Sequence, residues 1–202
     1  MDAIESIIFD WGGVLIDNPA PGLMRYLADA FGVPKAAYTA AHEKFGDEFQ
    51  KGMIGEEIFW ERVCGELNVS QPKVATLWGE AFRAVYRPKT EMFRLVRSLR
   101  DKGFKTALLS NAELPAMEFF YQQGYEMFNA VVFSCAERLA KPEREFYEVV
   151  LRKLASPANR SVFIDDRGEF VEGAKEAGLG AILYESSKQV KAELSRLGVN
   201  ID

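Results

Sequence analysis

Polar side chains follow three short apolar stretches of the chain, each at the point where the stretch ends. They are Asp10, Ser110, Asn111, Asp165 and Asp166. The stretches read as buried strands of a parallel sheet, whose carboxyl ends meet at one edge, where such sheets bind their ligands. Any one of these residues alone is typical of a helix cap or a turn. Together and in this order, they predict a site.

A lysine is expected at the same edge of the sheet. Lys141, followed by Pro142, lies between the apolar run Ala130–Phe133 and a predicted helix. A lone lysine is most often a solvated surface residue. Beside several carboxylates and a hydroxyl, however, its ammonium group indicates the binding of an anion such as phosphate.

The charges at this edge predict a metal ion. If Asp10, Asp165 and Asp166 converge, each pair of like charges about 4 Å apart costs roughly 4 kcal/mol at an effective dielectric constant of about 20. The carboxylates must then hold protons or bind a cation. Oxygen ligands without histidine or cysteine favour a hard ion, and magnesium is the usual one beside phosphate. The expected cofactor is therefore Mg²⁺.

Strands and helices alternate from Thr90 onward, and this alternation determines the expected fold. Strands are predicted at residues 6–9, 104–109, 130–133, 161–164 and 181–184. Helices are predicted at 90–102, 114–123, 143–154, after Asp166 as far as Ala177, and at 187–197. Because strand–helix–strand units connect parallel strands with right-handed crossovers, we predict an α/β, Rossmann-like three-layer sandwich with a mostly parallel sheet.

The segment between the first strand and the rest carries no convincing strand. Helices are predicted near residues 23–31, 35–50 and 55–67, with a fourth that is capped by Ser70 and runs to Val85. We therefore predict two domains. An α/β core comprises residues 1–17 and 89–202, and an all-helical cap of residues 18–88 is inserted after the first strand, where it can lie over the sheet edge as a lid.

The composition argues against several classes of partner. The 202 residues carry a net charge of −5, and this mildly acidic balance argues against nucleic acid or an anionic membrane. Cys64 and Cys135 lie in unrelated patterns, as free thiols of a reducing compartment do. We expect neither a signal peptide nor a membrane span. The expectation is a cytoplasmic monomer or homodimer that acts on a small phosphorylated molecule.

Four short motifs carry a resemblance that covers essentially the whole chain. The segment Asp10-Trp-Gly-Gly-Val-Leu-Ile-Asp17 resembles the first motif, Asp-x-Asp-Gly-Thr-Leu-x-Asp, of the haloacid dehalogenase superfamily. Leu108–Asn111, Lys141-Pro142 and Phe163–Asp166 resemble its second, third and fourth motifs, in the same order. The chain therefore resembles the branch of that superfamily in which a helical cap separates the first strand from the rest of the core.

The resemblance implies a magnesium-dependent phosphatase for a small phosphomonoester. Asp10 would be the nucleophile and would form an aspartyl-phosphate, which water then hydrolyses. The metal ligands would be Asp10, the backbone carbonyl of Gly12 and Asp166, with Asp165 as a direct or indirect ligand. The groups that bind phosphate would be the backbone N–H of Trp11 together with Ser110, Asn111 and Lys141. Ser110 and Lys141 would share the catalytic role with Asp10.

Position 12 departs from the family pattern. The phosphatases usually carry a second aspartate there, which protonates the leaving oxygen and later deprotonates water, but this chain has Gly12. Acid–base catalysis of this kind is typically worth about 10²–10⁴-fold. Four outcomes are open. The substrate has a good leaving group, as acyl and anomeric sugar phosphates do; the cap supplies the acid through His42, Asp47 or Glu48; the enzyme is slow; or it has left phosphate chemistry.

Two other functions stay open. The family's 2-haloacid dehalogenases also lack the second aspartate and need no metal, but they lack the acidic pair of the fourth motif, so Asp165 and Asp166 favour a phosphatase. The other alternative function is a catalytically weak binding or regulatory protein. The retained nucleophile, lysine and carboxylates argue against it.

The resemblance also suggests a substrate for the phosphatase. Bacterial glucose-1-phosphatases with an Asp-x-Gly first motif make a sugar phosphate one candidate substrate.

Substrate choice is expected to depend on the helical segment. By their spacing, its aromatic residues are mostly packing residues. We expect Phe45, Phe49 and Lys51 to face the site. The ring of Trp11 either walls the entrance or packs against the cap.

Overall fold

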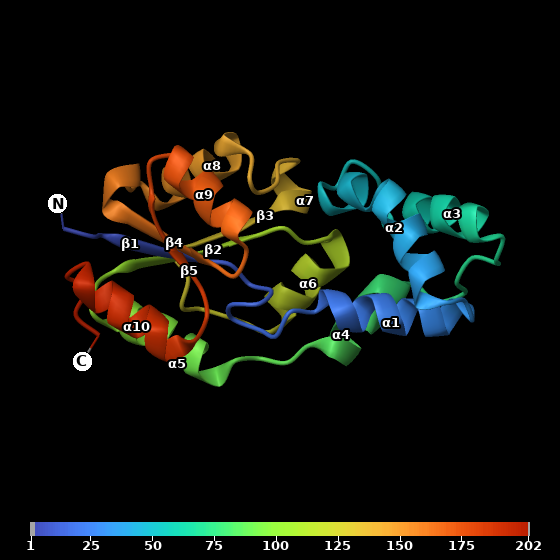
Figure 1. The fold of residues 1–202 in the computed structure, drawn as a ribbon, viewed down its shortest axis with the longest axis horizontal. Helices are drawn as coiled ribbons and strands as arrows, with labels where there is room; N and C mark the ends of the chain where they lie inside the picture. Colours follow the sequence, from blue (N-terminus) through green and yellow to red (C-terminus); the bar gives the residue numbers. More distant parts are fainter. Residues whose placement is uncertain (1–2, 202) are drawn as a thin grey trace.

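A computed structural model describes residues 3–201, which form a parallel five-stranded sheet with helices on both faces (Figure 1). The strand order is β3-β2-β1-β4-β5, and every pair is parallel. The strands are β1 (Ser6–Phe9), β2 (Lys105–Ser110), β3 (Ala130–Phe133), β4 (Ser161–Asp165) and β5 (Gly180–Leu183). The predicted α/β fold with a mostly parallel sheet is confirmed, and each strand lies within one residue of its expected bounds.

The central strand β1 is buried on both faces because its side chains alternate between two hydrophobic clusters. Ile7 and Phe9 pack into one cluster with helices α5 (Thr90–Asp101) and α10 (Ser187–Arg196). Ile8 packs into the other with α8 (Arg144–Leu154) and α9 (Gly168–Glu176). The two pairs of helices cover opposite faces of the sheet (Figure 1). This double cover explains why the strands are short and apolar throughout.

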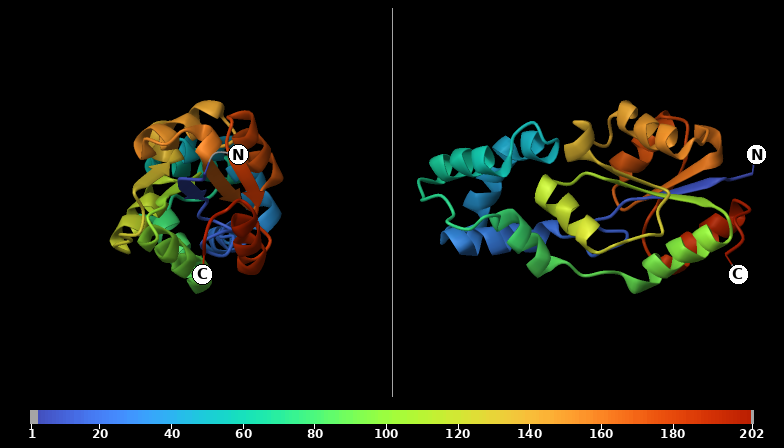
Figure 2. Two further views of the ribbon diagram at one scale, coloured as in Figure 1. Left: turned by 90° about the vertical axis from the view of Figure 1, so that its left-hand side faces the viewer. Right: turned by 180° about the vertical axis from the view of Figure 1, so that it is seen from behind.

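Four helices lie between β1 and α5. They are α1 (Ala20–Phe31), α2 (Lys35–Gln50), α3 (Glu56–Leu67) and α4 (Leu77–Val85). We call α1–α4 the helical insertion. It lies beyond the carboxyl ends of the strands, at the end of the molecule opposite to the two chain termini (Figures 1 and 2). Its interior is largely aromatic, with Phe49 and Phe59 stacked at 4.4 Å between ring centroids and Trp78 edge-on to both.

The expected start of the fourth helix is wrong. Ser70 does not cap it. The cap is Thr76, whose Oγ1 accepts the backbone N–H of Gly79 at 2.9 Å. The residues between include Pro72 and an exposed Val74, so the apolar helical spacing begins only at Leu77. Two short elements were not expected, α7 (Ser134–Glu137) and a 3-10 turn at Ala158–Arg160. Helix α6 (Leu114–Gln122) lies where a helix was predicted.

Two chain connections join the insertion to the sheet, and they run side by side. The N–H of Asp17 donates to the carbonyl of Arg87, and the N–H of Lys89 donates to the carbonyl of Leu15, both at 2.9 Å. Further contacts tie the end of α2 to α7, since the Ser134 hydroxyl donates to the Gln50 carbonyl at 2.7 Å. Within residues 3–201, no helix is both long and apolar enough to cross a membrane.

Candidate active site

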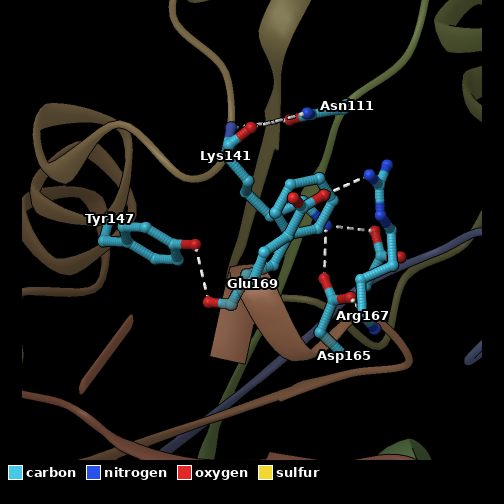
Figure 3. Close-up of polar contacts among 8 residues, drawn as sticks. Asn111, Lys141, Tyr147, Asp165, Arg167 and Glu169 are labelled. Atoms are coloured by element: carbon cyan, nitrogen blue, oxygen red, sulfur yellow. Dashed lines mark hydrogen bonds and ion pairs between the residues drawn. The ribbon is translucent and has the colours of Figure 1, made fainter. Parts of the chain in front are cut away.

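One buried lysine joins two aspartates at the carboxyl ends of β1 and β4. The Nζ atom of Lys141 lies 2.7 Å from Asp10 Oδ1 and 2.6 Å from Asp165 Oδ2. All three residues are buried, and Figure 3 shows the Lys141 side chain pointing at Asp165. Two carboxylates therefore share one ammonium group.

The sheet register explains why the two aspartates meet. Phe9 pairs with Ile164 in the neighbouring strand, so Asp10 and Asp165 leave their strands side by side. The N–H of Asp10 donates to the carbonyl of Ile164 at 2.9 Å, which holds the first residue after β1 in line with β4. A one-residue shift of β1 would turn Asp10 to the other face of the sheet.

Asn111 positions the lysine. Its side-chain Nδ2 donates to the Lys141 carbonyl at 3.1 Å, and its Oδ1 accepts the Lys141 N–H at 2.9 Å (Figure 3). The backbone N–H of Asn111 and the second hydrogen of its Nδ2 remain for the expected phosphate contact. The Tyr147 hydroxyl, also shown in Figure 3, donates to the Phe170 carbonyl at 2.8 Å and so ties α8 to α9.

Burial acts in opposite directions on the pKa values of Asp10 and Lys141. It raises the pKa of Asp10 to about 7, against the lowering effect of Lys141 and with a further increase from Asp165. Burial alone would lower the pKa of Lys141, but the two carboxylates raise it above its ordinary value. The lysine therefore stays charged, while Asp10 needs positive charge nearby to remain a carboxylate.

A third carboxylate completes an oxygen-rich cluster. Asp10, Asp165 and Asp166 each offer a ligand oxygen, and these atoms all lie within 4.8 Å of one another. Burial and the charge of Asp165 raise the pKa of Asp166. Three carboxylates against one lysine leave a net negative charge, and an all-oxygen donor set of this kind fits a divalent cation such as magnesium.

Gly13 makes room for Asp166. Its φ of +93° is one that residues with side chains rarely adopt, and a Cβ atom there would lie 2.0 Å from Asp166 Oδ2. The glycine is thus required twice, by the backbone turn after Asp10 and by the close approach of the carboxylate.

Pro19 occupies the space above Gly12. A Cβ atom on Gly12 would lie 3.1 Å from Pro19 Cδ, closer than ordinary van der Waals contact. The usual acid of the family pattern would project from this position. In this chain a proline ring stands there, and the acid must come from elsewhere if the reaction uses one.

A cavity of about 390 Å³ opens at the carboxyl ends of the strands and extends to the helical insertion. It is lined on the sheet side by the expected polar residues Asp10, Ser110, Asn111, Lys141 and Asp166. Much of the apolar lining comes from Trp11, Leu23, Met24, Trp78, Phe82 and Phe170, and five further polar residues are Asn18, His42, Gln50, Glu113 and Arg167. Trp11 and Gly12 line it too, so the predicted site residues share one cavity that the insertion helps to enclose, except Asp165, which is fully buried beside Lys141.

Trp11 both packs and lines the cavity. Its ring centroid lies 5.0 Å from that of Phe82 in the insertion and 5.3 Å from that of Phe120 in α6. The indole Nε1 is buried and has no hydrogen-bond partner among the described residues. The ring therefore links the two parts of the molecule directly beside Asp10.

Three residues of the insertion that were expected to face the site do not line its cavity. Phe49 packs inside the insertion, Phe45 lies under Arg62, and Lys51 pairs with Glu143 at 2.7 Å, so none of the three lines the cavity that contains Asp10. Lys51 lies just beyond the end of α2, and within that helix it is His42 and Gln50 that line the cavity.

Of the three acids expected from the insertion, one reaches the cavity. His42 lines it, and burial lowers its pKa to about 4, so that it is neutral at neutral pH. Asp47 pairs with Lys51 at 3.3 Å and is exposed, and Glu48 pairs with Arg62 at 2.9 Å. Neither of these two carboxylates lines the cavity.

Glu113 was missed by the sequence analysis. Its carboxyl is buried, accepts the Trp78 Nε1–H at 3.1 Å and lies 3.3 Å from Gln50 Nε2. Burial raises its pKa to about 7. A glutamate just before a helix is usually exposed, and the available signal was that it stands three residues after Ser110 at a strand end.

Comparisons with known proteins agree with this architecture. A family model described as haloacid dehalogenase-like hydrolase matches residues 4–178. The chain is 26% identical over 196 residues to the sesquiterpene phosphatase astK of Aspergillus oryzae, covering 96% of each protein. It is 29% identical over 203 residues to the mouse acyl-CoA dehydrogenase family member 10, covering 96% of this chain but only 19% of the mouse protein.

Among solved structures, the fold is similar to a haloacid dehalogenase family enzyme from Bacteroides thetaiotaomicron in complex with magnesium and inorganic phosphate. The TM-score is 0.73 at 21% identity, over 91% of this chain and 95% of the other. At this identity the likeness concerns the fold. The overall fold of this chain is thus similar to that of the bacterial enzyme.

Proposed function

The chain belongs to the haloacid dehalogenase-like hydrolases, and on that premise we propose that it is a magnesium-dependent phosphatase that hydrolyses a small phosphomonoester through an aspartyl-phosphate on Asp10. The observation that carries the proposal is the convergence of Asp10, Asp165 and Asp166 within 4.8 Å beside the buried Lys141. The phosphatase name of the fungal relative and the magnesium and phosphate of the bacterial structure support it.

In this proposal each residue of the site has one task. Asp10 attacks phosphorus, and Lys141 neutralises charge between the nucleophile and the phosphate. The Ser110 hydroxyl and the backbone N–H groups of Trp11 and Asn111 donate to phosphate oxygens. The attacked phosphorus then lies in the cavity, with the organic part of the substrate directed toward the insertion.

The same site would hold the metal. Its ligands would be the Asp10 and Asp166 carboxylates and the Gly12 carbonyl, with Asp165 held in place by Lys141 and by the Arg167 N–H at 2.8 Å. Magnesium bound there would supply the positive charge that the cluster lacks and orient the phosphate for attack. That charge also favours the ionised form of Asp10, which attack requires.

The alternatives make different chemical demands. A 2-haloacid dehalogenase reaction would bring a carboxylate substrate next to Asp165 and Asp166, which repel it in the absence of a cation. A binding or regulatory protein would have no use for a nucleophile whose carboxylate is paired with a buried lysine. The domain division at residues 18–88 and the lid role of the insertion are part of the proposal, as is the cytoplasmic monomer or homodimer.

The test is hydrolysis of p-nitrophenyl phosphate, whose leaving group needs little protonation. We expect activity with magnesium, none with a chelator, and none in Asp10→Asn. The matched control is Asp47→Asn, a carboxylate outside the cavity, which should leave the rate unchanged. Absence of hydrolysis together with absence of magnesium and phosphate binding contradicts the proposal. Metal-independent halide release from 2-chloropropionate would identify a dehalogenase instead.

A further inference from the structure

In-line attack decides where a proton donor must stand. The leaving oxygen lies opposite the attacking oxygen across phosphorus, so with Asp10 on the sheet side it points into the cavity, toward the insertion. The donor must therefore line this cavity and carry a proton at neutral pH. The titratable residues that line it are Asp10, His42, Glu113, Lys141, Asp166 and Arg167.

Most of these groups cannot serve as the proton donor. Lys141 stands between Asp10 and Asp165, and Asp166 belongs to the carboxylate cluster. The guanidinium of Arg167 does not give up a proton in proteins and pairs with Glu169 (Figure 3). His42 is neutral at neutral pH because burial lowers its pKa to about 4. Glu113 remains.

The carboxyl of Glu113 lies on the insertion side of the cavity. The residue precedes α6 in the core, yet its side chain contacts Gln50 at the end of α2 and Trp78 at the start of α4. The Trp78 Nε1–H donates to Oε2 at 3.1 Å. Oε1 can carry a proton, because the Gln50 amide, 3.3 Å away, can turn its oxygen toward it. The Gln50 contact is long, so the same proton can turn to a leaving oxygen in the cavity that Glu113 lines.

The surroundings of Glu113 keep it protonated. Burial raises its pKa to about 7, opposed only by hydrogen bonds from its own backbone, Gln50 and Trp78, and no positive charge among the described residues contributes. Tyr38 on α2 and Cys135 on α7 are neutral because burial raises both of their pKa values. On α3, the Glu56 carboxyl accepts the Trp78 backbone N–H and brings no positive charge to Glu113. A donor with a pKa near the working pH is the most effective kind.

We propose that Glu113 is the acid and base of the reaction, in place of the aspartate that the chain lacks at Gly12. As the bond between phosphorus and the leaving oxygen breaks, the Glu113 proton passes to that oxygen and an alcohol departs. Water then attacks the phosphorus of the aspartyl-phosphate, the bond from phosphorus to the Asp10 oxygen breaks, and one proton of the water passes to the Glu113 carboxylate as phosphate forms and the Asp10 carboxylate is restored. The inference rests on the proposed phosphatase function.

The experiment uses two substrates of similar size, p-nitrophenyl phosphate and p-nitrobenzyl phosphate, with magnesium. Only the second releases a strongly basic alkoxide that needs a proton. In Glu113→Gln, the rate with p-nitrobenzyl phosphate should fall about 10²–10⁴-fold, while the pre-steady-state burst of p-nitrophenol stays within roughly threefold of the wild-type rate. Glu48→Gln, a carboxylate of α2 outside the cavity, is the control and should affect neither.

Each outcome is decisive. A p-nitrophenol burst that slows as much as the rate with p-nitrobenzyl phosphate, or no loss of rate with p-nitrobenzyl phosphate, contradicts a proton-transfer role. Wild-type protein that hydrolyses only p-nitrophenyl phosphate also overturns the role of Glu113 but leaves the phosphatase standing, whereas hydrolysis of neither substrate removes the phosphatase itself. If Glu113→Gln does not fold, Glu113→Asp must show a loss confined to p-nitrobenzyl phosphate. The wild-type kcat/KM for that substrate must then also fall above pH 7, or the proposal fails.

Discussion

The ring of Pro19 covers Gly12 so closely that a Cβ atom on the glycine would lie 3.1 Å from the proline Cδ. The two residues thus fit each other, one without a side chain and the other with a ring that replaces it. If Pro19 is replaced by a smaller residue, the crowding of a Cβ atom on Gly12 is relieved. The coupling between the two positions can therefore be measured.

We expect Gly12→Ala to lower the free energy of unfolding by about 1–3 kcal/mol. In a Pro19→Ala background the same substitution should cost less, because the ring is gone. Urea denaturation of the four proteins of this double-mutant cycle measures the coupling. An equal cost in both backgrounds would show that Pro19 and Gly12 do not compete for this space.

Gly13→Ala should abolish magnesium binding. The new Cβ would lie 2.0 Å from Asp166 Oδ2, so the carboxylate has to move away from the cluster. The control is Gly103→Ala, whose φ of +89° is similarly strained but whose Cβ would meet nothing within 4 Å. Both variants should lose roughly 1 kcal/mol or more of stability, while calorimetric titration with magnesium should separate them. Normal magnesium affinity in Gly13→Ala would exclude Asp166 as a ligand.

Lys141→Met should destabilise the metal-free protein by about 3–5 kcal/mol at pH 8, because it leaves two buried carboxylates unpaired. The pKa of Asp10 is raised by burial, so at pH 5 the carboxyl takes up a proton and the loss becomes smaller. Lys153→Met, which removes an exposed partner of Glu137, should cost less than about 1 kcal/mol at either pH. Urea denaturation at both pH values tests this, and a pH-independent loss would contradict it.

Glu113 should make the protein less stable as the pH rises. Its pKa is about 7 in the folded chain against an ordinary value of 4.5, so the folded state binds this proton more tightly than the unfolded state. The resulting stability is complete below pH 4.5 and is lost as the pH rises through 7. The loss amounts to about 3 kcal/mol.

In Glu113→Gln this part of the pH dependence should disappear. The difference in unfolding free energy between pH 5 and pH 8 is therefore expected to be smaller in the variant than in the wild type, both measured without metal. Glu48→Gln serves as the control with an unchanged slope. Identical slopes in wild type and Glu113→Gln would mean that Glu113 is ionised in the folded protein.

The part of the site that lies at strand ends could be predicted from the sequence. Asp10 and Asp165 follow apolar runs that are buried on both faces, and parallel strands bring such ends together whatever the details of packing. Lys141 follows the strand Ala130–Phe133 and was expected at the same sheet edge. The structure places its ammonium group between Asp10 and Asp165.

The insertion side could not be predicted in the same way. Glu113 depends on Gln50 and Trp78, which are 63 and 35 residues away in the chain, and no local pattern records such contacts. Helical periodicity also indicated that α2 has a packed face without showing which part of it reaches the cavity. Ser70 and Thr76 are both good helix caps, so the sequence alone does not distinguish them. Only the packing of Leu77 and Trp78 selects the later start.

The paired connections at Asp17–Arg87 and Leu15–Lys89 have a consequence for proton traffic. They form one two-stranded link, and a rotation of the insertion about it that separated α2 and α4 from α6 would carry Gln50 and Trp78 away from Glu113. The carboxyl would then meet water, its pKa would return toward 4.5 and its proton would be released. Closing around a substrate would take up a proton and opening would discharge it, so that each conformational cycle would load the acid before chemistry begins.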